Sequence, residues 1–155
     1  MRLLSFFLLT LLSTIAQAAG AGTERIDTRY GVVDVVENPD TVTIRFQGKV
    51  LSTVKALGAS LYRVNPKDER EFVVVDNFTS GLYCHHVFVL VELHAGGKAS
   101  TSEPFGECKE LAGVAFHAGA PVIRLREPAI PGRRKSSIPA AYEWRSGKIV
   151  ERPGS

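Results

Sequence analysis

The sequence has little of what the common catalytic and metal-binding motifs require. It contains two cysteines, four histidines and one tryptophan in 155 residues, and it has no Cys-x-x-Cys or His-x-x-x-His spacing. It also lacks a Gly-x-Ser-x-Gly elbow, a phosphate-cradling glycine loop and a zinc-protease motif. These absences exclude the enzyme classes that can be recognised from short motifs. We therefore assign no catalytic residue, no metal ligand and no cofactor from the sequence.

A hydrophobic run long enough to cross a membrane is also absent. The apolar segment from Leu3 to Ile15 is shorter than the roughly 20 residues that a spanning helix needs. It follows Arg2 and precedes Ala16-Gln17-Ala18, the order of charge, apolar run and small residues found in secretory signals. We expect residues 1–18 to be a signal peptide cleaved after Ala18. Residues 19–155 then form one exported domain, periplasmic or secreted, with no membrane span.

The charge of the chain is only weakly unbalanced. The net charge is +3, and most lysines and arginines are interspersed with acids. Cationic residues gather only around a proline-rich stretch that we expect to form a loop over 128–139; they are Arg124, Arg126, Arg133, Arg134 and Lys135. A solvated loop is the simpler interpretation, and a phosphate or glycan site is the alternative. Nucleic acid is not an expected partner outside the cytoplasm.

Short β-strands account for nearly all of the hydrophobic pattern. In the segment from Asp40 to Phe46, for example, apolar residues alternate with polar ones. We expect strands at 30–36, 40–46, 49–56, 60–64, 71–78, 84–93, 99–102, 114–118, 121–126, 140–145 and 148–152. About ten short strands separated by turns are typical of an all-β, antiparallel sandwich or barrel-like meander. Recurring glycine turns would also suit propeller blades, but their unequal spacing favours ordinary hairpins.

The two cysteines predict both a compartment and a hairpin geometry. An exported chain with two cysteines is most simply read as containing one disulfide, Cys84–Cys108. If Ala95-Gly96-Gly97 forms a three-residue turn, His94 faces Lys98 and the cysteines lie opposite each other on one face. A two-residue turn would send the cysteine side chains to opposite faces, because strand side chains alternate with a period of two. The expected hairpin therefore has a three-residue turn or a bulge.

A chemical role for the residues around Cys84 is the competing interpretation. In a strand, Cys84 and His86 share one face and His85 points to the other, so the three cannot converge on one metal ion. Asp76 and Glu92 are further candidates for acid–base chemistry. Asp76 also fits a turn-forming role, and Glu92 lies among apolar residues of a predicted strand.

Part of the chain resembles a known group of proteins. The segments Tyr83-Cys84 and Ser102-Glu103-Pro104-Phe105-Gly106-Glu107-Cys108, with the hairpin from Trp144 to Lys148, are similar to a loose group of exported β-rich proteins of proteobacteria. That group combines a cysteine strand, a glycine turn and a Phe-Gly-x-Cys return. The resemblance implies a location and a fold, but it implies no activity.

These observations favour a periplasmic protein that acts by binding. The preferred hypothesis is a protein partner of the cell envelope, with the chain acting as an inhibitor or immunity-type protein. One alternative is an enzyme acting on a glycan or peptide, and another is a passive envelope component. Exposed loops carry the contacts in such binding proteins. The expected contact residues are His94 and Lys98 at the hairpin tip and Arg133, Arg134 and Lys135 in the proline-rich loop.

Overall fold

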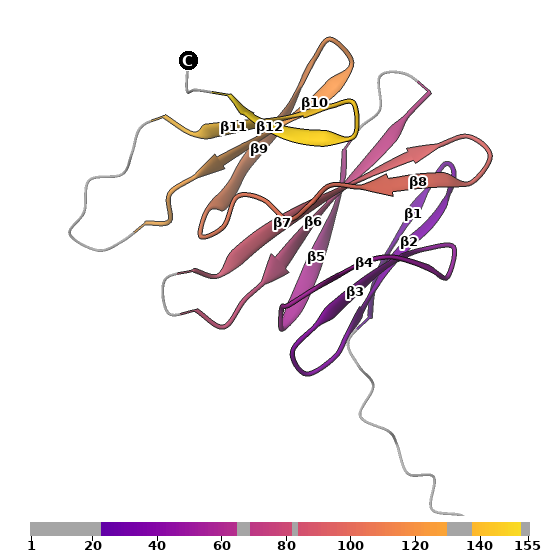
Figure 1. Ribbon diagram of the computed structural model, residues 1–155, viewed down its shortest axis with the longest axis horizontal. Helices are drawn as coiled ribbons and strands as arrows, with labels where there is room; N and C mark the ends of the chain where they lie inside the picture. The colour runs from indigo at the N-terminus through magenta and orange to yellow at the C-terminus, as the bar shows by residue number, and fades with distance from the viewer. Residues whose placement is uncertain (1–22, 65–68, 82–83, 130–137, 153–155) are drawn as a thin grey trace, which may run out of the picture.

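In the part of the chain that the structure describes, twelve strands form three antiparallel sheets (Figure 1). The computed structural model describes residues 23–64, 69–81, 84–129 and 138–152, and it contains no helix there. The N-terminal sheet comprises β1 (Thr23–Thr28), β2 (Gly31–Glu37), β3 (Val42–Phe46) and β4 (Lys49–Val54). The central sheet comprises β5 (Gly58–Val64), β6 (Glu71–Phe78), β7 (His86–His94) and β8 (Lys98–Thr101). The C-terminal sheet comprises β9 (Glu110–His117), β10 (Ala120–Arg126), β11 (Ala140–Arg145) and β12 (Lys148–Arg152).

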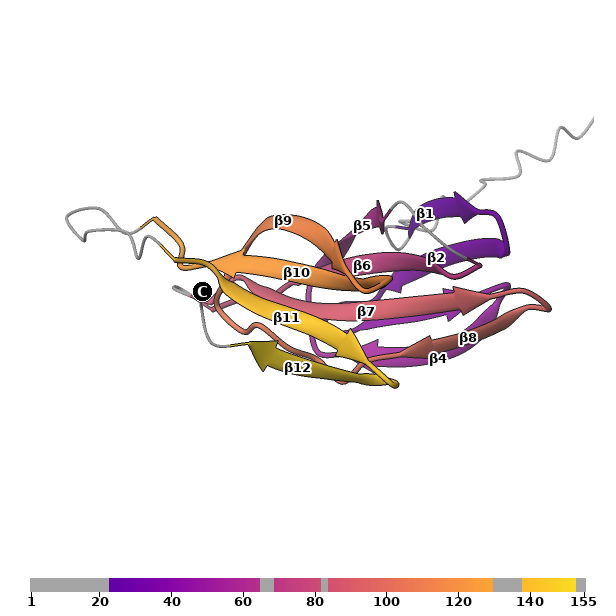
Figure 2. The same ribbon diagram turned by 90° about the horizontal axis from the view of Figure 1, so that it is seen from above.

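Each sheet is a meander of four consecutive strands, so neighbours in the chain are neighbours in the sheet. The N-terminal and C-terminal sheets lie on opposite sides of the central sheet (Figure 1). Seen from above, β11 of the C-terminal sheet runs beside β7 of the central sheet (Figure 2). The predicted all-β antiparallel meander is therefore confirmed. The three sheets are stacked in layers.

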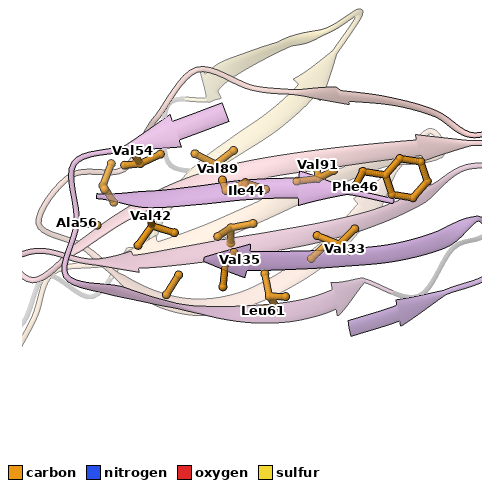
Figure 3. Packing of buried hydrophobic residues seen from close by; sticks show 14 of the residues in the cluster. Val33, Val35, Val42, Ile44, Phe46, Val54, Ala56, Leu61, Val89 and Val91 are labelled. Carbon is orange, nitrogen blue, oxygen red and sulfur yellow. The ribbon is translucent and has the colours of Figure 1, made fainter. Parts of the chain in front are cut away.

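The layering follows from the side chains of the central sheet, which is apolar on both faces. Val73 and Val75 of β6 belong to one core cluster with the valines of the N-terminal sheet. Figure 3 shows part of this cluster, with Val89 and Val91 of the central sheet beside Ile44 of the N-terminal sheet. Phe72 and Val74 of the same strand pack in a second cluster that includes Trp144 of the C-terminal sheet. Because strand side chains alternate between faces, an uninterrupted apolar run fits a strand that is covered on both sides. Fully burying each such side chain contributes about 1.5–3 kcal/mol.

Two carboxylates of the N-terminal sheet accept hydrogen bonds from backbone N–H groups at the edge of the central sheet. The Glu37 carboxylate accepts a hydrogen bond of 3.0 Å from the backbone N–H of Ala59. The Glu24 carboxylate accepts one of 3.1 Å from the N–H of Leu61. Both donors belong to β5, an edge strand whose unpaired N–H groups could otherwise pair with another chain. The edge of the central sheet is thereby covered from within the molecule.

The predicted strands correspond to eleven of the twelve observed. The bounds of β6, β11 and β12 agree with the prediction, whereas the remaining predicted bounds differ at one or both ends. The strand that sequence reasoning missed is β1, Thr23–Thr28, which has Ile26 as its only large apolar residue. It forms an edge of its sheet through six backbone pairs with β2. Residues 1–18, the predicted signal peptide, lie outside the described residues, as do Arg133, Arg134 and Lys135.

The predicted disulfide is present, and it closes the base of the β7–β8 hairpin. The Cα atoms of Cys84 and Cys108 are 4.0 Å apart. His94 pairs with Lys98 across the turn, which confirms the three-residue loop. The regular ladder ends at Thr101, however, and an isolated bridge then pairs Phe88 with Phe105 in a shifted register. The cysteines therefore lie beyond the ladder. The sequence had suggested that they would be directly paired residues of one continuous hairpin, and they are not.

Candidate functional site

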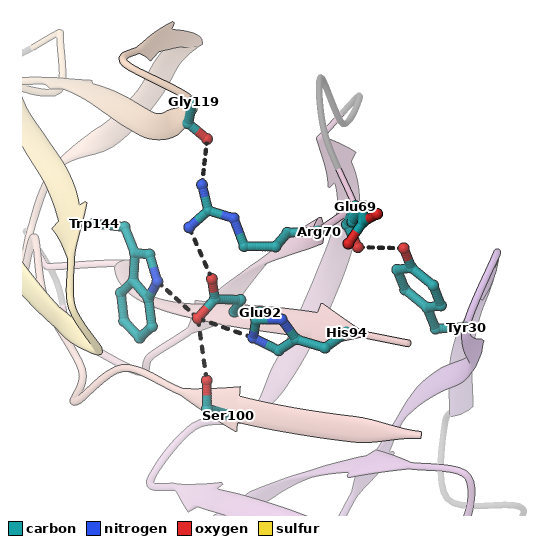
Figure 4. A network of polar contacts seen from close by, with 8 residues as sticks. All are labelled: Tyr30, Glu69, Arg70, Glu92, His94, Ser100, Gly119 and Trp144. Carbon is teal, nitrogen blue, oxygen red and sulfur yellow. Dashed lines mark hydrogen bonds and ion pairs between the residues drawn. The ribbon is translucent and has the colours of Figure 1, made fainter. Parts of the chain in front are cut away.

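A polar pocket lies at the tip of the β7–β8 hairpin. It has a volume of about 430 Å³ and is lined by Glu69, Arg70, His94, Ala95 and Lys98. The first two residues immediately precede β6, and the other three belong to the hairpin or its turn. Both hairpin residues that the sequence predicted as contact residues therefore line one concave surface. Figure 4 shows Glu69, Arg70 and His94 of this lining, together with the polar contacts around them.

The carboxylate of Glu92 lies beside this pocket and is almost fully buried. Its Oε2 accepts a hydrogen bond of 3.0 Å from the indole Nε1 of Trp144. Its Oε1 accepts one of 3.2 Å from Arg70. Ser100 Oγ and His94 Nε2 each lie 3.5 Å from Oε2 (Figure 4). A buried carboxylate is costly unless it is paired and hydrogen-bonded, and here partners surround both oxygens.

Arg70 links the three segments that meet at the pocket. One guanidinium nitrogen donates to Glu92, and another donates to the backbone oxygen of Gly119 at 3.0 Å. Gly119 lies in the turn between β9 and β10, so this bond reaches from the central sheet to the C-terminal sheet (Figure 4). The guanidinium carbon also lies 5.5 Å from the centroid of the Phe72 ring. The Arg70 side chain is therefore held in place by several independent contacts.

Lys98 differs from Arg70 in its surroundings. It is exposed at the tip, and it forms no ion pair or side-chain hydrogen bond with any residue in the described part of the chain. His94, its partner across the turn, is half-buried, and its Nε2 lies 3.5 Å from Oε2 of Glu92. The pocket thus combines a rigid, charge-compensated wall at Arg70 and Glu92 with two accessible nitrogen groups at its mouth. Such an arrangement can bind a polar group without changing its own shape.

A second pair of titratable side chains lies at the other end of the central sheet. The Nδ1 of His86 is 2.8 Å from the Oδ1 of Asp76, and the aspartate side chain is buried. Desolvation by burial raises the pKa of Asp76, and the hydrogen bond from His86 opposes that rise. The imidazole lies edge-on to Phe78, with ring centroids 5.5 Å apart, and stacks on Phe88 at 6.2 Å. The pair is oriented as in many acid–base sites.

The structure separates the candidates that the sequence grouped around Cys84. His85 is exposed, and its backbone oxygen accepts a hydrogen bond from the N–H of Thr79. His86 pairs with Asp76, whereas Glu92 lies beside the pocket toward the opposite end of β7 and pairs with Arg70. Sequence reasoning missed Arg70, Ser100 and Trp144 as partners of Glu92. The sequence did contain a signal for these partners. Glu92 is a charged residue on an otherwise apolar strand, β7, and the neighbouring strand β6 is also largely apolar, so a buried partner for its charge was required.

Two further properties bear on the chemistry of the chain. Within the residues that the structure describes, no group of three or more His, Cys, Asp or Glu side chains is placed to hold a metal ion. No helix that could cross a membrane occurs in those residues either. Comparisons with protein-family models, curated proteins and solved structures found no match to this chain.

Proposed function

We propose that this chain is an exported binding protein of the bacterial periplasm that acts on a protein partner without catalysing a reaction, as an inhibitor or immunity-type protein does. The disulfide between Cys84 and Cys108 is compatible with an oxidising compartment. The binding site in this proposal is the hairpin-tip pocket. A polar segment of the partner inserts there and pairs with Lys98 and His94.

The observation that carries the proposal is the contrast between the rigid wall and the accessible mouth of the pocket. Arg70 and Glu92 neutralise each other and are anchored to the C-terminal sheet through Gly119 and Trp144. The wall of the pocket therefore loses little conformational entropy when a partner binds, which favours affinity. Lys98 supplies a cation that no described residue neutralises. An acidic side chain of the partner is its natural counterpart.

The same contacts argue against general-base catalysis by Glu92. The Glu92 carboxylate already accepts hydrogen bonds from Trp144 and Arg70, so both of its oxygens are engaged within the protein. A general base also needs access to the substrate proton, and the Glu92 side chain is 9% exposed. Binding is therefore the better interpretation of this pocket.

The experiment is a capture assay with residues 19–155, which contain all twelve strands and both core clusters. The tagged chain is incubated with envelope extract, and the recovered proteins are identified by mass spectrometry. We expect one stoichiometric partner whose affinity falls at least tenfold, about 1.4 kcal/mol, in Lys98→Glu. Lys55→Glu makes the same charge change at an exposed position between β4 and β5 and should retain the partner. Equal capture by Lys98→Glu and wild type, or repeated recovery of nothing, would contradict the proposal.

The Asp76–His86 pair supports a second candidate function, hydrolysis of a glycan or peptide. The 2.8 Å contact and the raised pKa of Asp76 are the observations in its favour. Its test is His86→Ala, which would abolish an activity while leaving the melting temperature close to that of the wild type. A passive envelope component, the third possibility, would show neither a partner nor an activity.

A further inference from the structure

The outer face of the C-terminal sheet carries an unusual concentration of cations. Strand alternation places Ile123 and Tyr142 against the central sheet, so their neighbours along β10 and β11 point outward. The backbone pairing then defines the outward set on all four strands. Its charged members are Arg124, Arg126, Arg145, Lys148, Arg152, Glu110 and Glu143. With His117 neutral, this face has a net charge of +3.

The opposite outer face of the stack is electrically balanced. The same alternation rule on the N-terminal sheet places two arginines and two aspartates outward. They pair with each other: Arg45 with Asp34, and Arg25 with Asp27 at 3.4 Å. One outer face thus has a net charge of zero and the other a net charge of +3, so the charge of the molecule is distributed asymmetrically. An anionic partner is attracted to the C-terminal sheet and not to the chain as a whole.

A buried carboxylate organises the cationic face. Glu143 is 3% exposed and lies on β11 in the middle of the sheet. Its carboxylate accepts from Arg145 at 2.7 Å and pairs with Arg152 at 3.1 Å and His117 at 3.2 Å. These contacts, the hydrogen bond from Arg145 first among them, hold the pKa of Glu143 below its ordinary value. The two guanidinium groups are thus fixed along the sheet surface and remain half exposed.

We propose that the outer face of the C-terminal sheet, β9–β12, binds an anionic lipid surface through the phosphodiester groups of its lipids. The charge complementarity lies in the cations Arg124, Arg145, Lys148 and Arg152. A lipid surface fits better than a linear polymer because the cations spread in two dimensions. Four strands about 4.8 Å apart, with outward residues about 7 Å apart along each strand, present a broad face. The exposed Val150 lies on the same face and adds apolar contact.

Lipid vesicles provide the test, with residues 19–155 as the protein. The chain is mixed with vesicles of equal parts phosphatidylglycerol and phosphatidylcholine or of phosphatidylcholine alone, and the bound fraction is measured by sedimentation. We expect binding only to the anionic vesicles. It should be strong at about 0.1 M salt and lost at about 1 M, where the screening length falls from about 10 Å to about 3 Å.

Matched variants locate the binding surface. Arg124→Gln combined with Lys148→Gln removes two charges that form no ion pair with Glu143, so the fold should be retained. We expect the partition coefficient to fall about 25-fold, roughly fivefold for each cation. The control, Lys49→Gln combined with Lys55→Gln, removes two exposed cations outside the C-terminal sheet and should change it less than twofold.

Three results would overturn this proposal. The wild type could fail to bind anionic vesicles, or both double variants could bind equally well, which would mean that net charge alone decides. Binding to soluble dextran sulfate without binding to vesicles would assign the face to a polymer instead. Each result is independent of the hairpin-tip pocket, because Lys98 and His94 lie on the central sheet.

Discussion

The indole Nε1 of Trp144 donates a hydrogen bond of 3.0 Å to the Oε2 of Glu92, although 52 residues separate them in the sequence. The bond joins β11 to β7 and so connects two layers through a buried charge. Trp144→Phe should lower the free energy of unfolding by about 3 kcal/mol, because it removes a charge-assisted hydrogen bond and leaves a small cavity. Urea denaturation measures the loss.

Tyr142→Phe is the control for that substitution. It removes a hydroxyl from the same strand whose partners, Lys109 and Glu151, lie nearer the surface. Its cost should stay below about 1 kcal/mol. If the two variants lost the same stability, the Trp144–Glu92 bond would not be a major link between the sheets.

The disulfide should contribute substantially to stability. Cys84 and Cys108 are 24 residues apart in sequence, and a crosslink of that span constrains the unfolded chain by about 3.5 kcal/mol in the loop-entropy account. The double variant Cys84→Ser with Cys108→Ser should lose about that much in urea denaturation. Reduction of the wild type should produce the same loss. Two titratable thiols in denaturant without a reductant would show that the bond is not formed.

Gly106 occupies a position where backbone strain and packing can be separated. Its φ is +67°, and an added Cβ would lie 2.1 Å from the Leu125 side chain and 3.2 Å from Phe88. Gly96 has a similar φ of +77° but open space around it. Gly106→Ala should therefore cost about 1–3 kcal/mol more than Gly96→Ala, the range typical of overpacking. Equal melting temperatures for the two variants would mean that the core around Leu125 is loosely packed.

Because of the Asp76 carboxyl, the free energy of unfolding should decrease as the pH rises from about 3 to about 6. Burial raises its pKa above the ordinary 3.8, so the folded chain binds this proton more tightly than the unfolded chain does. The contribution of Asp76 to the free energy of unfolding is therefore largest below pH 3.8 and falls as the pH rises through the raised pKa. Relative to Asp76→Asn, the wild type should lose stability over that rise. Urea titrations between about pH 3 and pH 6 measure the difference.

Glu143 should behave in the opposite way. Its pKa lies below the ordinary 4.5, because Arg145, His117 and Arg152 stabilise the carboxylate. Its contribution is present above pH 4.5 and disappears as the pH falls through the lowered pKa. As the pH falls, the difference in free energy of unfolding between the wild type and Glu143→Gln should shrink. Over the same range, the wild type should gain stability relative to Asp76→Asn. If both variants changed in stability with pH in the same direction relative to the wild type, the opposite pKa shifts of Asp76 and Glu143 would be contradicted.

The strands were predictable because alternation and turn chemistry are local properties. Counting residues between the cysteines predicted a three-residue turn or a bulge, and the structure contains both the turn from His94 to Lys98 and a register shift before Phe105. β1 was missed because its residues are mostly polar, and backbone pairing with β2 makes it a strand. Its existence depends on a neighbour more than on its own composition.

The stacking and the pocket could not be predicted in the same way. The run Phe72 to Val75 is apolar without interruption, which is compatible with a strand covered on both faces but also with other buried segments. The partners of Glu92 come from Arg70, 22 residues away, and from Trp144 in another sheet. Contacts of that kind depend on how layers are superposed. No spacing rule within one strand encodes them.

The meander order also fixes when each interface can form during synthesis. Because the three sheets occupy successive stretches of the chain, the valines of β2 and β3 are not fully covered until β5, β6 and β7 have emerged. The other face of the central sheet is covered only after Ile123 and Trp144 have been synthesised. A nascent chain arrested before β10 would display an apolar sheet face to its surroundings. The C-terminal sheet therefore acts as the closing layer, and termination of the chain within it would produce an aggregating product and not a smaller folded one.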